Sequence, residues 1–164
     1  KYLADTGRLD QVSRGVYTLP EVWEDEFVSI QERYKRGVFA LDTALFLHDL
    51  TDRTPHKFHM AFPYGYNTSS PKAAGILCSC KKEPYYSLGI ALVDTPAGNT
   101  VRAYNAEKTL CEILKPISHT DIQIITDAFK RYAGRKDKNI PLLSEYAHQL
   151  RVEKRLRPYL EVLL

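Results

Sequence analysis

The apolar residues change their spacing partway along the chain, and this change constrains the fold more than any other feature of the sequence. Between residues 58 and 104 they form short strand-like runs, as in "KFHMAF", where Phe58, Met60 and Phe62 alternate and fall on one face of a predicted strand. From residue 105 onward they recur every three or four residues, which is the period of an amphipathic helix. We therefore expect an α+β fold, with a small, mainly antiparallel sheet, flanking helices and a helical C-terminal part.

The middle of the chain supplies the predicted strands. "ILCSC" places Ile76, Cys78 and Cys80 on one face, and "TVRAY" follows the turn "DTPAGN" as the hairpin partner of "YSLGIALV". The run "YSLGIALV" is almost continuously apolar, which favours a central strand. The segment at residues 63–75 is rich in Pro, Gly, Asn and Ser, which predicts a loop.

Helices are predicted on both sides of these strands. Asp42 and Asn105 are suited to the N-cap position, Thr120 with Gln123 resembles a capping box, and Gly37 is suited to end the first helix. The predicted helices cover residues 23–36, 43–50, 106–114, 121–133 and 140–150, followed by a last helix that is broken or kinked at Pro158. The residues expected on their core faces are Trp23, Phe27, Ile30, Tyr34, Leu110, Ile113, Leu114, Ile122, Ile125, Phe129, Tyr132, Leu143, Tyr146, Ala147 and Leu150.

A β-hairpin is predicted near the start of the chain, in "RLDQVSRGVYTLP" at residues 8–20. Two short runs of alternating apolar and polar residues flank Ser13, Arg14 and Gly15. A glycine can take the left-handed conformation that a three-residue turn needs. An isolated two-stranded hairpin is only marginally stable in water, so we expect this hairpin to belong to a larger unit.

Composition limits the class of protein. A chain of 164 residues, with 44% hydrophobic and 26% charged residues, fits an ordinary globular protein. Three cysteines, an odd number, argue against a disulfide framework and for a reducing, cytoplasmic compartment. No run of 18 apolar residues and no secretory leader is present, so no membrane partner is expected.

Positive charge is concentrated towards the C-terminus. Between residues 130 and 157 nine basic residues face only three acidic ones, in a chain whose net charge is +3. Such a region either binds an anionic partner or is a solvated helix surface. The basic residues are Lys130, Arg131, Arg135, Lys136, Lys138, Arg151, Lys154, Arg155 and Arg157.

Two groups of residues could in principle bind a metal. His56 and His59 are three residues apart, but on a strand this spacing points the side chains to opposite faces. Cys78 and Cys80 share a face without further ligands nearby, and with Cys111 they are better explained as buried apolar residues. We expect no metal site and no cofactor.

Two further groups could in principle take part in catalysis. His48, Asp49 and Asp52 lie around a predicted helix end, where a polar cluster is common without any chemical role. Glu107 begins a predicted helix, where the helix dipole stabilises a carboxylate. Phosphate-binding glycine loops and nucleophile-elbow motifs are absent from the sequence, and we expect no catalytic residues and no enzymatic activity.

An ordered set of segments resembles one known family. "GRLDQVSRGVYTLP" looks like the wing of a winged helix-turn-helix, preceded by the end of a recognition helix. Downstream, "GVFALDTALFLHDLTDRTP", "MAFPYGYN", "YYSLGI", "GNTVRAYNAEKTLCEIL" and "YLEVLL" follow in the order found in that family. Together they resemble the AbiEi antitoxins of bacterial abortive-infection (phage-defence) systems. The resemblance implies residues 1–20 as the end of an N-terminal winged helix-turn-helix and residues 21–164 as a C-terminal antitoxin domain.

The resemblance also implies a function. AbiEi-like proteins are type IV antitoxins and transcriptional autoregulators: the N-terminal domain binds inverted repeats in the promoter DNA of the operon and represses it. The C-terminal domain counteracts an AbiEii-like nucleotidyltransferase toxin, and a stable complex with the toxin is not required. Arg8 and Arg14 on the wing are the expected DNA-binding residues, and the nine basic residues form the expected antitoxicity patch.

Parts of this expectation depend on residues before Lys1. The sequence given has no Met at position 1 and lacks the helices that precede the recognition helix in the family. We therefore expect this chain alone to bind promoter DNA poorly, since base readout needs the complete recognition helix in the major groove.

Two other classes of function stay open at this point. The first is a plain transcriptional repressor whose C-terminal part serves dimerisation or ligand sensing. The second is a nucleic-acid-processing enzyme that uses Glu107 or the residues from His48 to Asp52.

Overall fold

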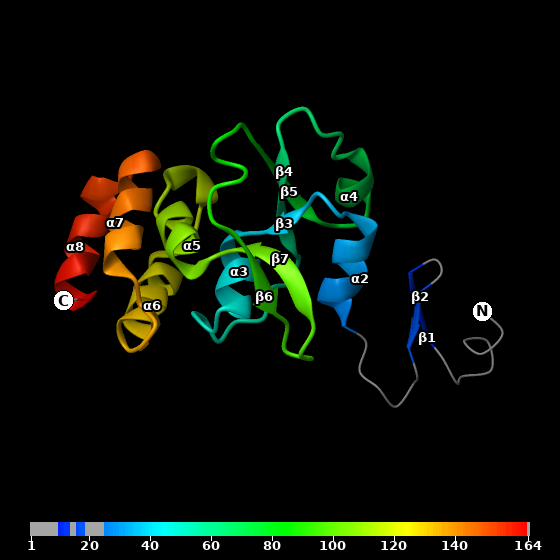
Figure 1. Ribbon diagram of the computed structural model, residues 1–164, viewed down its shortest axis with the longest axis horizontal. Helices are drawn as coiled ribbons and strands as arrows, with labels where there is room; N and C mark the ends of the chain where they lie inside the picture. The colour runs from blue at the N-terminus through cyan, green and yellow to red at the C-terminus, as the bar shows by residue number, and fades with distance from the viewer. Residues whose placement is uncertain (1–9, 14–15, 19–24, 164) are drawn as a thin grey trace.

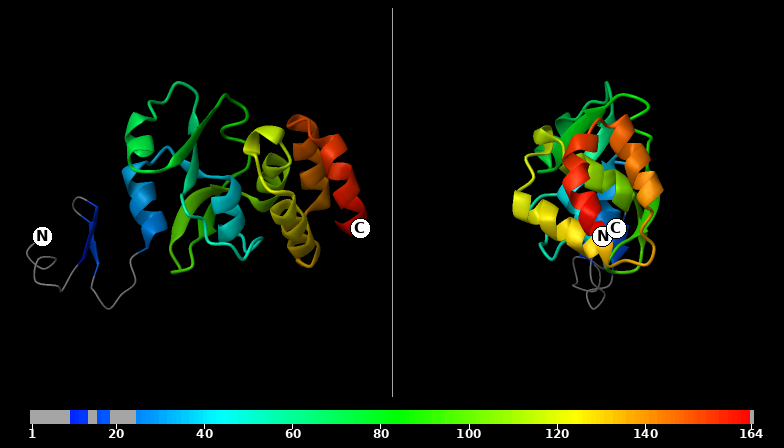
Figure 2. Two further views of the ribbon diagram at one scale, coloured as in Figure 1. Left: turned by 180° about the vertical axis from the view of Figure 1, so that it is seen from behind. Right: turned by 90° about the vertical axis from the view of Figure 1, so that its left-hand side faces the viewer.

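The computed structural model describes residues 10–13, 16–18 and 25–163 of the chain. Within this part the protein has an α+β fold, as the change of hydrophobic period predicts, with one two-stranded and one five-stranded sheet. The larger sheet lies at the centre, with the helical C-terminal part packed against one end of it (Figures 1 and 2).

The predicted hairpin is confirmed by the structure. Strands β1 (Asp10–Ser13) and β2 (Val16–Thr18) pair antiparallel, with an irregularity in register between Gln11 and Ser13. The predicted recognition helix before it, with Arg8, and the turn residue Arg14 lie outside the described residues. The assignment of the hairpin as a wing therefore stays a prediction.

The five-stranded sheet is mixed, and the expectation of a mainly antiparallel sheet is wrong. Its order is β5-β4-β3-β7-β6, with antiparallel pairs β3–β4 and β6–β7 and parallel pairs β4–β5 and β3–β7. The pattern of alternating residues predicts strands but carries no information on the direction of their partners. The bounds of its strands are Val38–Phe39 for β3, His59–Pro63 for β4, Leu77–Lys81 for β5, Ile90–Asp94 for β6 and Thr100–Tyr104 for β7.

Two further expectations for the strand region are wrong. Strand β6 is an edge strand, and its Leu92 is 75% exposed, although its apolar run favours a central position. The predicted loop at residues 63–75 contains helix α4 (Ser69–Ala73), which lies in the connection between the parallel strands β4 and β5. A helix of five residues is too short to show a hydrophobic period.

Helices account for most of the rest of the described chain. Helix α8 continues through Pro158, so of the two predicted alternatives the break does not occur and the kink stays a prediction. A 3₁₀ turn at Pro116–Ser118 separates α5 from α6. The helix bounds are Glu26–Arg33 for α2, Leu41–Leu47 for α3, Ala106–Ile113 for α5, Ile122–Ala133 for α6, Ile140–Gln149 for α7 and Glu153–Leu163 for α8.

Three hydrophobic clusters hold these elements together. One face of the sheet packs Phe39, Met60 and Phe62 against Phe27 of α2 and Tyr34, which follows that helix. The other face forms a small cluster with the connection between β5 and β6. A third cluster joins α3 and α5 to α6, α7 and α8, and it contains all four of the residues predicted for the core face of α7.

Some residues predicted to be buried are exposed. Ile122, the first residue of α6, is 63% exposed, whereas Ile125, Phe129 and Tyr132 of the same predicted face are buried. Cys80 is exposed and Cys78 is half-buried on the edge strand β5, whereas Cys111 in α5 is buried as expected. Trp23 lies outside the described residues.

The structure assigns different capping residues to two helices. Helix α3 begins at Leu41 after Ala40, and the Asp42 carboxylate accepts only from the next N–H, that of Thr43, so the predicted Asp42 cap is wrong. Asp121, and not Thr120, caps α6. The predicted cap of α5, Asn105, is confirmed by a bond of 2.8 Å from the Lys108 N–H.

Asp25 is the N-cap of α2 and also joins this helix to the sheet. Its Oδ1 accepts from the N–H groups of Phe27 and Val28, and its Oδ2 accepts from Thr95 and Asn99 in the turn between β6 and β7. One carboxylate thus stabilises a helix start and fixes it to a hairpin distant in sequence.

We predict that D25A lowers the free energy of unfolding by about 2 kcal/mol, since an N-cap is worth roughly 1–2 kcal/mol. D42A is the matched control, with an expected change below about 0.5 kcal/mol, because Asp42 satisfies no free helix donor beyond Thr43 and burial raises the pKa of its carboxyl group. Urea denaturation of both variants at pH 7 measures the difference. Equal losses in the two variants would contradict the assignment of the caps.

Gly37 serves packing and does not end a helix, since α2 has its C-cap at Tyr34. A Cβ atom at residue 37 would lie 2.5 Å from Cε and 2.8 Å from Sδ of the buried Met60. At Gly134 a Cβ atom would meet only a backbone oxygen at 3.7 Å.

We predict that G37A destabilises the protein by about 1–3 kcal/mol, because Met60 must move in a closely packed core. G134A should leave the stability unchanged or raise it by up to about 1 kcal/mol, since its backbone conformation suits alanine. The two midpoints of urea denaturation test this contrast. A G37A variant as stable as G134A would show that the core accommodates the methyl group freely.

Candidate functional site

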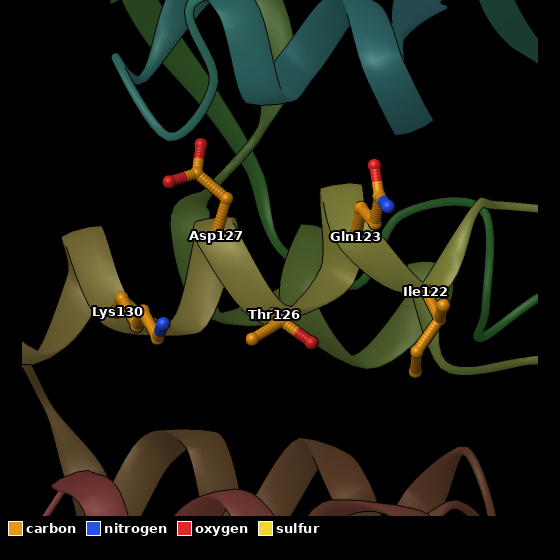
Figure 3. A pocket seen from close by; sticks show the side chains of 5 residues that line it. All are labelled: Ile122, Gln123, Thr126, Asp127 and Lys130. Carbon is orange, nitrogen blue, oxygen red and sulfur yellow. The ribbon is translucent and has the colours of Figure 1, made fainter.

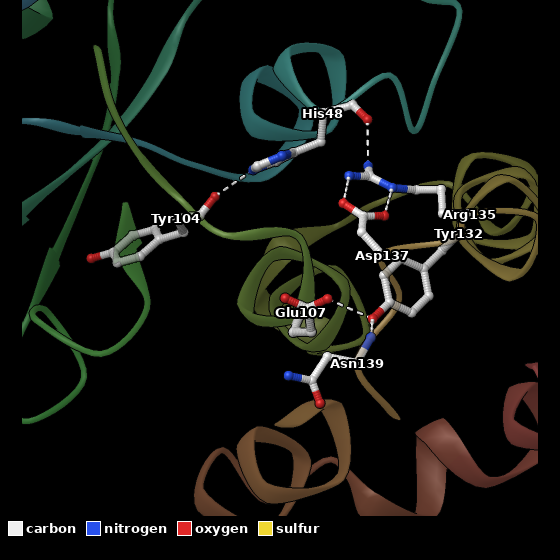
Figure 4. A network of polar contacts seen from close by, with 7 residues as sticks. All are labelled: His48, Tyr104, Glu107, Tyr132, Arg135, Asp137 and Asn139. Atoms are coloured by element: carbon white, nitrogen blue, oxygen red, sulfur yellow. Dashed lines mark hydrogen bonds and ion pairs between the residues drawn. The ribbon is translucent and has the colours of Figure 1, made fainter. Parts of the chain in front are cut away.

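The C-terminal end of α6 meets the C-terminal end of α3 and the junction of β7 with α5, and polar side chains gather there (Figure 4). The structure brings together at this place two groups that the sequence suggested separately, the residues around His48 and the basic residues of α6. These residues form the candidate functional site.

His48 is the C-cap residue of α3, and its ring is directed to the sheet. The distance from Nε2 to the carbonyl oxygen of Tyr104 is 2.8 Å. A carbonyl oxygen only accepts hydrogen bonds, so Nε2 carries the hydrogen. Burial lowers the pKa of His48 below its usual value, although the bond to Tyr104 opposes this shift. The ring therefore serves as a neutral donor that fixes α3 to the end of β7.

Arg135 connects the same point to the turn after α6. Its Nε and Nη2 atoms donate to the two carboxylate oxygens of Asp137 at 2.8 and 2.7 Å, and its Nη1 donates to the carbonyl oxygen of His48 at 2.8 Å. The bond from Arg135 holds the pKa of Asp137 below its usual value. A bidentate pair of this kind fixes the guanidinium group in one orientation.

Glu107 lies deeper, at the start of α5. Its Oε2 accepts from the Tyr132 hydroxyl at 2.5 Å, and that hydroxyl accepts from the N–H of Asn139 at 2.7 Å. Burial raises the pKa of Tyr132 above its usual value, and the bond to Glu107 adds to this shift. The hydrogen bonds of Glu107 and Tyr132 thus hold α5, α6 and the start of α7 together, so these two side chains have a structural role.

A polar cavity of about 330 Å³ lies beside these contacts, lined by Leu47, His48, Asp49, Arg131 and Arg135. Arg131 contributes a second guanidinium group, which is 2.8 Å from Asp127 and 4.0 Å from Asp52. Both arginines are therefore already paired with carboxylates, and the cavity has mixed charge. It suits a small polar ligand better than a bare anion.

A second cavity, of about 300 Å³, lies along the outer surface of α6. Gln123 and Asp127 lie on one side of the helix, and Ile122, Thr126 and Lys130 lie on the other (Figure 3). Its lining combines apolar, polar and charged groups from a single helix, which is typical of a contact surface rather than of a catalytic cleft.

The structure divides the predicted antitoxicity patch into paired and unpaired cations. Arg131 and Arg135 belong to the contacts above. The other seven are exposed, and no carboxylate lies within 4 Å of them in the described part of the chain; they are Lys130, Lys136, Lys138, Arg151, Lys154, Arg155 and Arg157.

The unpaired cations fall into two groups. The first group comprises Lys130 in the last turn of α6 with Lys136 and Lys138 in the turn after it. The second group comprises Arg151 in the turn before α8 and Lys154, Arg155 and Arg157 in the first half of α8. Because α7 connects the two turns and has ten residues, its two ends are about 15 Å apart. The patch is therefore two basic areas on one helical layer.

The two histidines considered as metal ligands do not form a site. Nε2 of His59 is 3.1 Å from Oγ of Ser79, and burial lowers the pKa of His59 to about 4. His56 is exposed in the segment before β4. In the residues that the structure describes, no group of three His, Cys, Asp or Glu side chains is arranged to hold a metal ion.

Two members of the candidate site are not predicted from the sequence. Asp137 orients Arg135, and Tyr132, whose ring places it in the predicted core, donates its hydroxyl hydrogen to Glu107. Arg135 and Asp137 have opposite charges and lie two residues apart just after α6, which is only a weak sequence signal for their pairing. The partner of Tyr132 lies 25 residues away, so no local pattern indicates it.

A comparison of the chain with protein-family models and with curated protein sequences found no match. No helix in the described part of the chain is long and apolar enough to cross a membrane.

We predict that the protein loses stability as the pH falls from about 6.5 to about 4, because His48 and His59 have lowered pKa values in the folded state. Below pH 6.5 the unfolded chain takes up protons that the folded chain does not, and this favours unfolding. Each of H48Q and H59Q should reduce this loss between pH 7 and pH 5, measured by urea denaturation. If the free energy of unfolding changed with pH equally in both variants and in the unchanged protein, the buried, neutral state of the two rings would be contradicted.

Proposed function

We propose that this chain is an antitoxin of the AbiEi kind, whose C-terminal part counteracts a nucleotidyltransferase-like toxin. The ordered resemblance of segments across the sequence supports this proposal. The chemistry of the candidate site is compatible with it, because His48 and Glu107 bind a backbone carbonyl and a tyrosine hydroxyl and are used structurally. The proposal therefore places function on the surface of the domain and not in its interior.

The observation that carries the proposal is the set of seven exposed cations without a carboxylate partner on the layer formed by α6, α7 and α8. Isolated surface charges of this kind contribute little to stability. A concentration of one sign of charge attracts an oppositely charged partner over about the Debye length, roughly 8–10 Å at physiological salt. A nucleotidyltransferase binds nucleotides and nucleic acids, which are anionic. An acidic surface on the toxin itself is the other kind of partner that the basic residues would attract.

The proposed mechanism is competition. The two basic areas bind either the anionic ligand of the toxin or an acidic face of the toxin itself, and so reduce the amount of active toxin–substrate complex. Weak, rapidly reversible contacts are sufficient for this effect, in agreement with a system in which no stable complex is required. Promoter binding is assigned to the complete N-terminal domain, with Arg8 and Arg14 as wing residues that contact phosphate.

We predict that charge reversal on the helical layer reduces antitoxin activity. The variants are K130E/K136E for one basic area and K154E/R155E for the other, and both leave Arg131 and Arg135 in their structural contacts. The assay is growth of cells that express the cognate toxin together with each variant. At least one variant should lose rescue, since its surface then repels an anionic partner.

The matched control is K35E/K57E, which changes the same number of exposed lysines outside the helical layer and should retain rescue. Circular dichroism and urea denaturation show whether each variant is folded. Full rescue by both folded charge-reversal variants would contradict the role of the basic areas. Absence of rescue by the unchanged chain would contradict antitoxin function and favour the plain repressor.

A further inference from the structure

Two exposed tyrosines lie where the parallel strands β4 and β5 end. Tyr64 directly follows β4 and is 70% exposed, and Tyr85 lies in the connection from β5 to β6 and is 39% exposed. The N–H of Tyr64 donates to the carbonyl oxygen of Lys81, the last residue of β5, at 2.9 Å. The turn after β4 and the connection after β5 therefore leave the sheet at the same edge, the upper one in Figure 1.

Tyr64 is held at the tip of a fixed turn. The N–H of Tyr66 donates to the carbonyl oxygen of Pro63 at 3.0 Å, and Gly65 between them has a φ of +88°, which favours glycine. The ring of Tyr66 stacks on the buried Phe62, with centroids 4.6 Å apart. One tyrosine of the turn thus anchors it in the core while its neighbour projects into solvent, at little cost in conformational freedom on binding.

The backbone at Tyr85 is held by a buried lysine. Nζ of Lys108 donates to the carbonyl oxygens of Tyr85 and Leu88, both at 2.7 Å, and lies 3.6 Å from the centroid of the Tyr104 ring. The charge of Lys108 is enclosed by these groups, since its side chain is fully buried. It fixes the connection after β5, so that the second exposed tyrosine is also presented from an ordered segment.

The charge beside Tyr64 is positive. Nζ of Lys82 lies 4.9 Å from the centroid of the Tyr64 ring, and no carboxylate lies within 4 Å of it in the described part of the chain. The neighbouring Lys81 is engaged by Glu112 at 2.6 Å, and Glu83 accepts from Ser87. Lys82 is therefore a cation at this edge that has no carboxylate partner among the described residues and lies against an exposed ring.

We propose that Tyr64, Lys82 and Tyr85 form a binding surface for single-stranded nucleic acid. A base stacks on the face of the exposed Tyr64 ring opposite Lys82, and Lys82, which lies over the other face, meets an adjacent phosphate. Tyr85 provides a second ring at the same edge for a neighbouring base. Exposed aromatic rings combined with positive charge are the features by which proteins bind single strands without reading sequence, because every base has a stacking face.

A duplex does not fit this surface in the same way. Its bases are already stacked on one another, so the tyrosine rings cannot reach their faces without opening the helix. The surface is also separate from the basic areas on α6, α7 and α8. The proposal concerns direct binding, and it stands or fails independently of antitoxin activity.

The test is fluorescence anisotropy of the full chain with a labelled single-stranded RNA, the same sequence as single-stranded DNA, and the matching duplex. We expect saturable binding of at least one single strand with a Kd at or below about 100 µM at low salt. Y64A should weaken that binding about tenfold, as expected for the loss of one stacked base. Y64W should retain it, because the indole ring also stacks.

K82A tests the electrostatic part of the same surface. It should weaken binding and lower the slope of log K against log salt by about 0.7, the value for one phosphate contact on a single strand. K57A is the matched control, since Lys57 is an exposed lysine before the opposite end of β4, and it should change neither quantity. Whichever of RNA and DNA binds more tightly identifies the preferred strand.

Three results would overturn the proposal. They are no saturable binding of either single strand up to about 100 µM, equal affinities for the unchanged protein and the folded Y64A/K82A variant, and binding of the duplex alone. If Y64A/K82A instead lost capture of the purified toxin, with no oligonucleotide bound by the unchanged protein, the surface would be a protein interface and the proposal would be wrong.

Discussion

The burial of charged side chains on α5 is the constraint on which the rest of the structure depends. Every residue from Ala106 to Ile113 is buried, and a buried charge is costly unless a partner offsets the loss of water. Lys108 meets this requirement with the carbonyl oxygens of Tyr85 and Leu88, and burial lowers the pKa of its ammonium group to about 8. A single lysine thus orders the connection between β5 and β6, which carries part of the proposed single-strand surface.

The two carboxylates of α5 are also buried, and their partners join this helix to other elements. Glu107 accepts from Tyr132, which connects α5 to α6 and to the start of α7. Oε2 of Glu112 pairs with Lys81 at the end of β5, while its buried Oε1 has no hydrogen-bond partner among the described residues. Helix α5 therefore lies between the sheet and the helical layer and determines the position of both proposed surfaces.

The sequence predicted what depends on local pattern. The shared face of Phe58, Met60 and Phe62 and the predicted core face of α7 are confirmed, since alternation and helical spacing directly reflect burial on one side. It did not predict the edge position of β6 or the capping role of Asp25, because both depend on which elements become neighbours. For the candidate site it identified His48 and Arg135 separately. Their contact joins residues 87 positions apart, and no local pattern indicates it.

The sequence by itself determined the α+β class, the hairpin near the start, most helix positions and the concentration of positive charge towards the C-terminus. These follow from the spacing of apolar residues and from composition, which act over a few residues along the chain. The tertiary structure alone decided the mixed sheet, the division of the basic residues into two areas, and the meeting of Tyr64 with Lys82. Each of these depends on which segments become neighbours in the folded chain, and the spacing of residues along the sequence does not encode that.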